Sequence, residues 1–407
     1  MTVPPAGPTA PEERADAVSG WFATRLGGVL VPLAATALAF LIGGLVVLIT
    51  GSNPITAYKA IFEGTGLTWF FQLDPGGAPW TWWDLESEAA NDLQQTLILM
   101  TPLILTAIAV AFAFRCGLFN IGGQGQYWVG FFAALYVGTH LEGTPRPLHI
   151  LIAVLASIVG GGLWGGIAGI LKATVGAHEV ITTIMLNWIA IFGGAYLVEI
   201  GGRLQGPEPS IPRSDVVFES AKLWPIWGSR PALHAGLFVA LFALVVYYVI
   251  LNRTTLGYEV RAVGFNPEAA RYGGISVPKN YFLALAISGG FAGLAGSIDL
   301  LGFKGAVSTG DFSTNLIAFT GIAVALLGRN KAVGILFAAL LFAALQVGTS
   351  TRQLDPEVFE PALAVDLATM IQALVIFFVG AELLILYAWR ARRFLTPQPR
   401  VTPELER

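Results

Sequence analysis

The 407-residue sequence has few of the residues that build disulfides, metal centres and catalytic sites. It contains one cysteine, Cys116, which cannot form a disulfide within the chain. Four histidines are present, and His178 has no second histidine or cysteine at the spacing of a metal site. No nucleophile, general base or metal-ligand set stands out. We therefore expect no redox framework, no metal and no cofactor.

Charge is also scarce, because charged residues make up 12% of the chain and the formal net charge is −3. The basic residues are scattered over short segments, which argues against a nucleic-acid-binding surface. The sequence has no G-x-x-x-x-G-K-[ST] phosphate loop, so the chain cannot hydrolyse ATP in the P-loop manner. If ATP drives its function, another polypeptide must hydrolyse it.

Apolar residues are abundant, at 55% of the chain with a mean hydropathy of +0.68. Apolar runs of about 18 residues or more are typical of membrane-spanning helices. The pattern therefore predicts an all-α polytopic membrane protein rather than a soluble one. Ten spans are predicted, at 29–50, 93–114, 122–140, 149–171, 180–200, 234–251, 281–302, 314–328, 332–349 and 363–388.

The distribution of basic residues predicts the orientation of these spans. A cytoplasmic N-terminus places most of the 23 lysines and arginines on the cytoplasmic side, and the even span number then places both termini there. The predicted parts are a cytoplasmic segment 1–28, a transmembrane domain 29–388 and a cytoplasmic basic tail 389–407. Within the domain, 51–92 and 202–233 are predicted external loops, and 253–280 is a predicted cytoplasmic loop.

One stretch of the predicted cytoplasmic loop, "NPEAARYG", has the signals of a short polar helix. It begins with an N-capping asparagine and a proline suited to the first turn, and it has an acid early and a base late. A helix this short is marginal alone in water, so we expect it to pack on something. A partner protein and the rest of the chain are both candidates. The residues are Asn266, Pro267, Glu268, Ala269, Ala270, Arg271, Tyr272 and Gly273.

Two stretches place polar side chains in or next to predicted spans. "FNIGGQGQ" carries Asn120, Gln124 and Gln126 among glycines, and Thr183 and Asn187 lie on one face of the span 180–200. Such groups are costly facing lipid and tolerable where they line a cavity or are buried in protein. The first stretch predicts a broken or re-entrant helix. A translocation pathway is one interpretation, and close helix packing with interhelical hydrogen bonds is the other.

Four stretches resemble one family of transport proteins. "EAARYGGISVP", from Glu268 to Pro278, resembles an abbreviated EAA loop of bacterial ATP-binding cassette (ABC) importer permeases. "CGLFNIGGQGQYWVG", "HEVITTIMLNWIA" and "FTGIAVALLGRNKAVG" resemble the branched-chain amino acid, simple-sugar and nucleoside permeases, most closely their nucleoside branch. Many relatives carry an acid where this chain has Gln124, so no role of that carboxylate carries over.

The resemblance implies a ten-helix fold of the cobalamin-importer type (type II) in a bacterial inner membrane. It also implies three partners: an ABC ATPase held by the coupling helix 266–273, a second permease subunit forming a heterodimer, and an extracytoplasmic substrate-binding lipoprotein. The predicted function is import of a nucleoside or simple sugar. The alternatives are an ion-coupled secondary transporter using Asp366 and Glu382, and a membrane scaffold that transports nothing.

Overall fold

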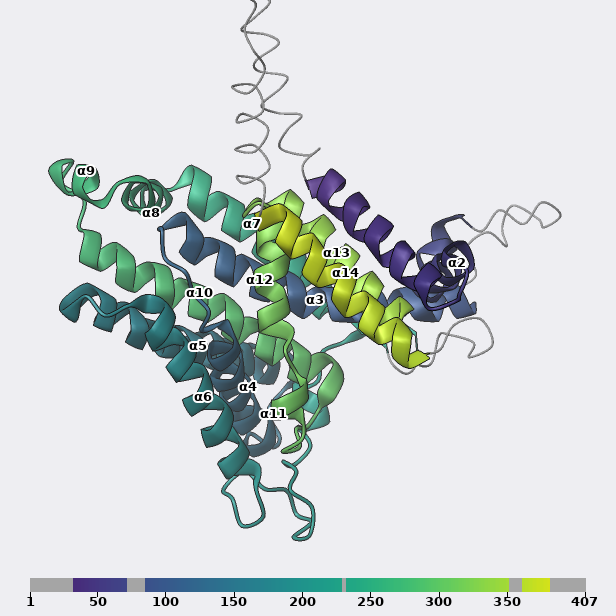
Figure 1. Cartoon of the computed structure of the whole chain (residues 1–407). Coiled ribbons are helices and arrows are strands. Elements are labelled where there is room, and N and C mark those ends of the chain that lie inside the picture. Colours follow the sequence, from purple (N-terminus) through teal and green to yellow (C-terminus); the bar gives the residue numbers. More distant parts are fainter. Residues whose placement is uncertain (1–31, 72–84, 229–231, 351–360, 381–407) are drawn as a thin grey trace, which may run out of the picture. The chain divides into compact units, whose positions relative to one another are not determined.

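A computed structural model describes residues 32–71, 85–228, 232–350 and 361–380 (Figure 1). Most of these residues are helical, and the two short strands β1 (Pro225–Trp227) and β2 (Leu233–His234) pair antiparallel. The α-helices are Pro32–Ile49, α2 (Pro54–Gly64), α3 (Glu88–Arg115), α4 (Gly123–His140), α5 (Arg146–Val175), α6 (Glu179–Val198), α7 (Gly236–Arg253), α8 (Thr255–Phe265), α9 (Pro267–Tyr272), α10 (Val277–Asp299), α11 (Asp311–Thr314), α12 (Ile317–Leu327), α13 (Ala332–Gly348) and α14 (Pro361–Gly380). The 3₁₀-helices η1 (Leu67–Phe71) and η3 (Glu219–Ala221) and the π-helix η4 (Leu300–Lys304) complete the elements.

Each of the ten predicted spans contains a helix, which confirms a polytopic helical membrane protein. Six helices of the described part are long and apolar enough to cross a bilayer, and three shorter apolar ones occur at 311–327, 332–348 and 365–380. The count of ten spans and the side of each terminus stay predictions. The predicted segments 1–28 and 389–407 lie outside the described residues.

The chain divides into two compact units. One comprises residues 1–46 and 369–407, of which 32–46 and 369–380 are described and helical. The other comprises residues 47–368 and holds all the sites considered below. In this larger unit α3 is enclosed by α10, α12, α13 and α7. Since α3 is apolar around its whole circumference, burial on every side is the arrangement its sequence favours.

Small residues bring α5 and α10 into close contact, and Figure 1 shows the two helices side by side. A Cβ atom built on Gly161 of α5 would lie 2.3 Å from the carbonyl oxygen of Gly289 on α10. One built on Gly293 would lie 2.2 Å from the carbonyl oxygen of Ser157. Helix pairs in membranes associate through such small residues because they let the backbones approach.

The larger unit has two ends that differ in structure. We call the first the α9 end, which holds α8, α9, the C-terminus of α3 and the turn at 328–331. There Arg115 Nη2 and Tyr247 Oη both donate to the carbonyl oxygen of Asn330, each at 2.8 Å. We call the other the loop end, which holds residues 199–228, 232–235 and 300–315. Isolated bridges join Gln205 to Ser214 and Arg213 to Ser308 in it.

The segments predicted as loops contain helices. Residues 51–92 hold α2 and η1, and residues 253–280 hold α8 and α9. The apolar-run criterion misses α2 because it is only 11 residues long. It packs on α13, where the glycine Gly348 lets the carbonyl of Ile61 approach. This contact between distant segments stabilises a helix too short for propensity to hold alone.

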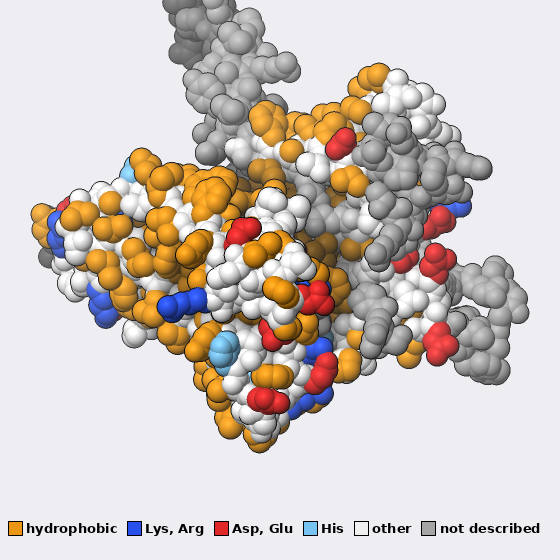
Figure 2. All heavy atoms as spheres, turned by 90° about the horizontal axis from the view of Figure 1, so that it is seen from below, with side chains coloured by type: hydrophobic (Ala, Val, Ile, Leu, Met, Phe, Trp, Pro, Cys, Tyr) orange, Lys and Arg blue, Asp and Glu red, His pale blue; other side chains and the backbone are white. Residues whose placement is uncertain are grey.

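Hydrophobic side chains cover much of the surface. Figure 2 shows a face with broad hydrophobic areas around a centre where acidic, basic and histidine side chains gather. Exposed apolar residues repeat along α5, as at Leu151, Leu155 and Leu163, and along α6, as at Phe192 and Tyr196. In water such faces would be a liability, whereas in a bilayer they face a solvent as apolar as themselves.

His234 is buried in β2, outside the candidate spans. Burial lowers the pKa of its imidazole from 6.5 to about 4, an effect that the nearby Asp299 carboxylate partly opposes. Its Nδ1 accepts a hydrogen bond from the Gly236 N–H at 3.2 Å, which a neutral ring can do and an imidazolium cannot.

We expect the free energy of unfolding to fall as the pH is lowered from 6.5 to about 4. Over this range the unfolded chain binds a proton at His234 that the folded chain excludes, and the difference is worth about 3 kcal/mol. Thermal unfolding in detergent measures it, with His234→Gln as the comparison. Equal pH dependence in the two proteins would contradict the expectation.

Candidate functional site

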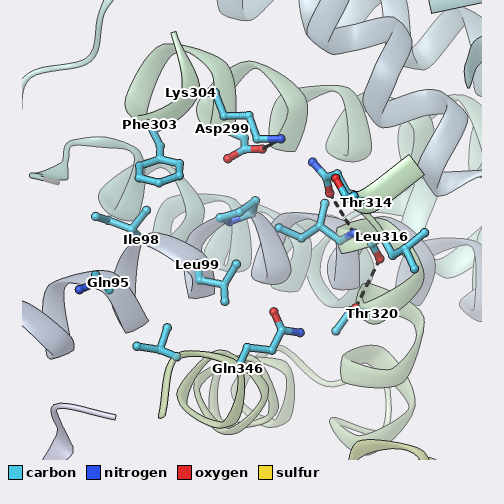
Figure 3. Close-up of a pocket in the computed structure, with 14 residues that line it drawn as sticks. Gln95, Ile98, Leu99, Asp299, Phe303, Lys304, Thr314, Leu316, Thr320 and Gln346 are labelled. Atoms are coloured by element: carbon cyan, nitrogen blue, oxygen red, sulfur yellow. Dashed lines mark hydrogen bonds and ion pairs between the residues drawn. The ribbon is translucent and has the colours of Figure 1, made fainter. Parts of the chain in front are cut away.

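A cavity of about 540 Å³ opens in the larger unit toward the loop end. Its walls come from the first part of α3, the C-terminus of α10 with η4, residues 314–320 and the end of α13. Segments from α3, from residues 299–320 and from α13 therefore meet around one space (Figure 3). The volume lies within the range of about 300–1,000 Å³ typical of small-molecule sites.

An acid and a base from adjoining turns lie on one wall of the cavity. Lys304 Nζ lies 3.5 Å from Asp299 Oδ2 and 4.0 Å from Asp311 Oδ1. In an α-helix, residues five apart point roughly 140° away from each other. The π-turn changes this, because Gly305 N–H donates to the Leu300 carbonyl over five residues at 2.8 Å. Such turns often mark functional sites.

Side chains of α4 contact both members of the Asp299–Lys304 pair, which we call the charged pair. Tyr127 Oη donates to Asp299 Oδ2, and Asn315 Nδ2 donates to that Tyr127 oxygen at 3.1 Å. The Lys304 ammonium lies 5.6 Å from the centre of the Trp128 ring, within cation–π distance. Paired charges inside a membrane protein are rare and indicate function more often than stability.

The other walls of the cavity combine amides with apolar side chains. Gln95 on α3 and Gln346 on α13 both line it, and Figure 3 shows the Gln346 amide directed into the space below Asp299. Within the described part of the chain, neither amide makes a hydrogen bond, so both are available to a ligand. Ile98, Leu99 and Leu316 supply apolar surface between them.

The five polar residues predicted for the pathway come together at the N-terminus of α4, and all five are buried. We call them the polar cluster. Hydrogen bonds of the four amides link the start of α4 and the residues before it to α6, α10 and α12, and Thr183 lies beside Gly122. The residues are Asn120, Gln124, Gln126, Thr183 and Asn187.

Each amide of the polar cluster has partners. Asn120 and Gln126 pair through two hydrogen bonds of 2.9 and 3.2 Å. Asn187 accepts from the Gly125 N–H at 2.7 Å and donates to the Ile121 carbonyl at 2.9 Å. These bonds satisfy the backbone where the chain turns from α3 into α4, as the packing interpretation predicted.

None of the five lines the cavity. The nearest link is Gln124, whose Nε2 donates to the carbonyl of Asn315 at 2.6 Å and whose Oε1 accepts from the Ala318 N–H. Asn315 itself lines the cavity. The polar cluster therefore contacts one wall of the cavity through the hydrogen bonds of Gln124. A direct role of the five residues in the pathway stays a prediction.

The predicted polar helix is present as α9. Asn266 caps it, with Oδ1 accepting from the Glu268 and Ala269 N–H groups at 3.0 and 3.1 Å. Only Ala270 of this helix is buried, against its own chain. The Tyr272 side chain is 94% exposed, and Phe265 at the end of α8 is 96% exposed. Two fully exposed aromatic rings beside one short helix are typical of a protein-binding surface.

Neither charge of the cavity was predicted from the sequence. Asp299 lies inside the predicted span 281–302, and that single acid in an apolar run was the available signal. Of the acids proposed for ion coupling, Asp366 is exposed on α14 and does not line the cavity, and Glu382 lies outside the described residues.

Comparison with known proteins agrees with this architecture. Residues 93–380 match the family described as "Branched-chain amino acid transport system / permease component". The guanosine ABC transporter permease protein NupP of Bacillus subtilis is 39% identical over 88% of this chain and 94% of its own length. The nucleoside permease protein NupB of Lactococcus lactis is 34% identical over 88% and 92%. The glucose permease protein TsgB13 of Haloferax volcanii is 33% identical over 86% of each. No solved structure matches the chain significantly. The chain belongs to the family of branched-chain amino acid transport system permease components.

Proposed function

We propose that this permease imports nucleosides across the inner membrane of a bacterium, as one subunit of an ABC importer. The observation that carries the proposal is the similarity to two nucleoside permeases over almost nine-tenths of the chain. The cavity supports it, because amides and apolar side chains alternate on its walls as a polar heterocyclic ligand requires. ATP hydrolysis is the work of a separate subunit.

The cavity is the outer part of the translocation pathway in this proposal. The basic-residue distribution places the α9 end in the cytoplasm and the loop end outside, so the cavity faces the side from which a nucleoside arrives. One chain walls the cavity only in part, and a second permease subunit, different from this one, completes it. Together the two form a type II importer, to which this chain contributes ten spans.

The two ends of the larger unit bind different soluble partners. The exposed aromatic rings of Tyr272 and Phe265 and the charges of α9 contact the ATPase. The predicted external loop 202–233, of which 202–228 and 232–233 are described, receives the substrate-binding lipoprotein. A short polar helix with a well-formed cap fits a groove in a partner, because its backbone is already ordered before binding.

The polar cluster closes the pathway behind the cavity in this proposal. Replacing Asn187 with leucine leaves the Gly125 N–H and the Ile121 carbonyl without partners, at a cost of about 1–3 kcal/mol for each buried group. We expect the purified Asn187→Leu complex to melt at a lower temperature than the unmodified complex. We also expect nucleoside uptake per assembled complex to be lower than that of the unmodified complex.

Thr182→Val is the matched control for Asn187→Leu, because Thr182 lies on the same helix outside the polar cluster. The Thr182 hydroxyl donates only to the carbonyls of His178 and Glu179 at the start of its own helix, so its loss costs little. Normal uptake per assembled Asn187→Leu complex would show that the polar cluster is structural alone.

Uptake of labelled nucleosides tests the proposed function. The chain is expressed with its partner subunits in cells that lack other nucleoside importers, and accumulation of guanosine and uridine is compared with that of glucose. We expect ATP-dependent accumulation of a nucleoside. Accumulation of glucose alone would replace the proposal with sugar import, which the glucose permease relative makes the second candidate.

A further inference from the structure

The charged pair on the cavity wall has unused bonding capacity. Tyr127 and Lys304 both approach Asp299 through Oδ2. Among the described residues, no hydrogen bond or ion pair uses Asp299 Oδ1. The Lys304 ammonium has no carboxylate within hydrogen-bonding distance, since its two acidic neighbours are 3.5 and 4.0 Å away. A ligand can therefore bond to an acceptor oxygen and to a donor nitrogen side by side.

Among the described residues that line the cavity, Asp299 and Lys304 are the only ionisable ones, and their formal charges cancel. A neutral ligand enters without leaving a charge unpaired, whereas a phosphorylated one brings charge that the single lysine, already shared with two acids, cannot balance. The Phe303 ring on the same wall and the leucines opposite supply apolar contact for one face of a ring.

We propose that Asp299 and Lys304 form a binding subsite for the vicinal hydroxyl groups of an uncharged sugar ring. One hydroxyl donates to Asp299 Oδ1, and its neighbour accepts from Lys304 Nζ, because a hydroxyl both donates and accepts. The diol can belong to a nucleoside or to a free sugar. The subsite rests on the proposed import function. Through it the permease itself selects the substrate, in addition to the selection made by the binding protein.

The chain offers a direct probe of occupancy, because its one cysteine, Cys116, is buried at the α9 end. A Gln346→Cys variant places the only accessible thiol of this chain in the cavity. Its rate of reaction with a membrane-impermeant thiol reagent is measured on the full importer without ATP, using a cysteine-free partner set. Uridine, glucose and 2′,3′-dideoxyuridine are the added ligands.

We expect uridine to slow the reaction and 2′,3′-dideoxyuridine to do so only at concentrations about tenfold higher or more, as the loss of charge-assisted hydrogen bonds implies. Protection by uridine alone identifies a nucleoside diol, and protection by glucose as well identifies any sugar diol. Equal protection by uridine and dideoxyuridine, or protection by neither uridine nor glucose, overturns the subsite.

A second experiment replaces the Asp299 carboxylate, the proposed acceptor, with an uncharged amide. In the Gln346→Cys background, Asp299→Asn should abolish the preference for uridine over dideoxyuridine. Glu142→Gln should keep it, because Glu142 is an exposed acid between α4 and α5 that does not line the cavity. If Asp299→Asn does not assemble, Lys304→Gln provides the same comparison. A preference that survives in the variant overturns the subsite. Failure of the import function is separate, because it appears as absent nucleoside uptake with the unmodified chain.

Discussion

Reversing Arg271 to glutamate is expected to detach the ATPase while leaving the permease at near-normal abundance. Arg271 and Glu268 lie 3.5 Å apart on α9, with side chains 65% and 70% exposed. Such an exposed pair contributes little to folding. In the contact with the ATPase that we propose for α9, however, the guanidinium would make a charge-assisted hydrogen bond worth about 1.5–3 kcal/mol. Its loss, with a new repulsion, weakens the contact about tenfold to a hundredfold.

Two measurements on the same membranes check this. Permease abundance reports folding, and the ATPase retained after washing reports the contact. Lys279→Glu is the matched control, since Lys279 is an exposed base of the same end on α10, outside α9. If Arg271→Glu keeps its ATPase and full transport, α9 is not the coupling helix. If abundance falls instead, α9 serves only its own chain.

Replacing Gly161 with alanine should remove most of the folded permease. The new Cβ would lie 2.3 Å from the Gly289 carbonyl oxygen and 2.8 Å from the Gly293 Cα atom. Both neighbours are backbone, so no side chain can rotate away and α5 and α10 must separate. Overpacking costs about 1–3 kcal/mol where side chains can adjust, and here we expect at least the upper value, a large share of a typical folding free energy.

Gly193→Ala is the control, because a Cβ on this helical glycine of α6 meets nothing within 4 Å. It should fold as well as the unmodified chain. Abundance in membranes and the melting temperature in detergent give the comparison. A Gly161→Ala protein as abundant and as stable as Gly193→Ala would show that the α5–α10 contact adapts at low cost.

The helical elements and the start of α9 follow from local sequence. Hydropathy is a property of a continuous run, so every apolar run yields a helix whatever it later packs against. The Asn266 cap bonds to N–H groups two and three residues away, so the same few residues that predict it also form it. The Glu268 and Arg271 positions on that helix follow for the same reason.

The sequence also indicated which polar residues belong inside, but not what they contact. Asn120, Gln126 and Asn187 are costly in lipid, and their residue types alone predict burial or a cavity. Their partners come from separate segments, since Gly125 and Asn187 are 62 residues apart. Only the packing of α4 on α6 decides that these groups satisfy one another and stand behind the cavity wall.

The cavity itself depended entirely on tertiary structure. An α-helical reading of 277–304 turns Asp299 and Lys304 to different faces, and the π-turn, which brings them to one wall, has no signature in the residues themselves. The facing amides Gln95 and Gln346 are 251 positions apart in the sequence. Local preference determines where helices form, because their hydrogen bonds join near neighbours. The cavity forms where the surfaces of several helices fail to meet, and that depends on all of them at once.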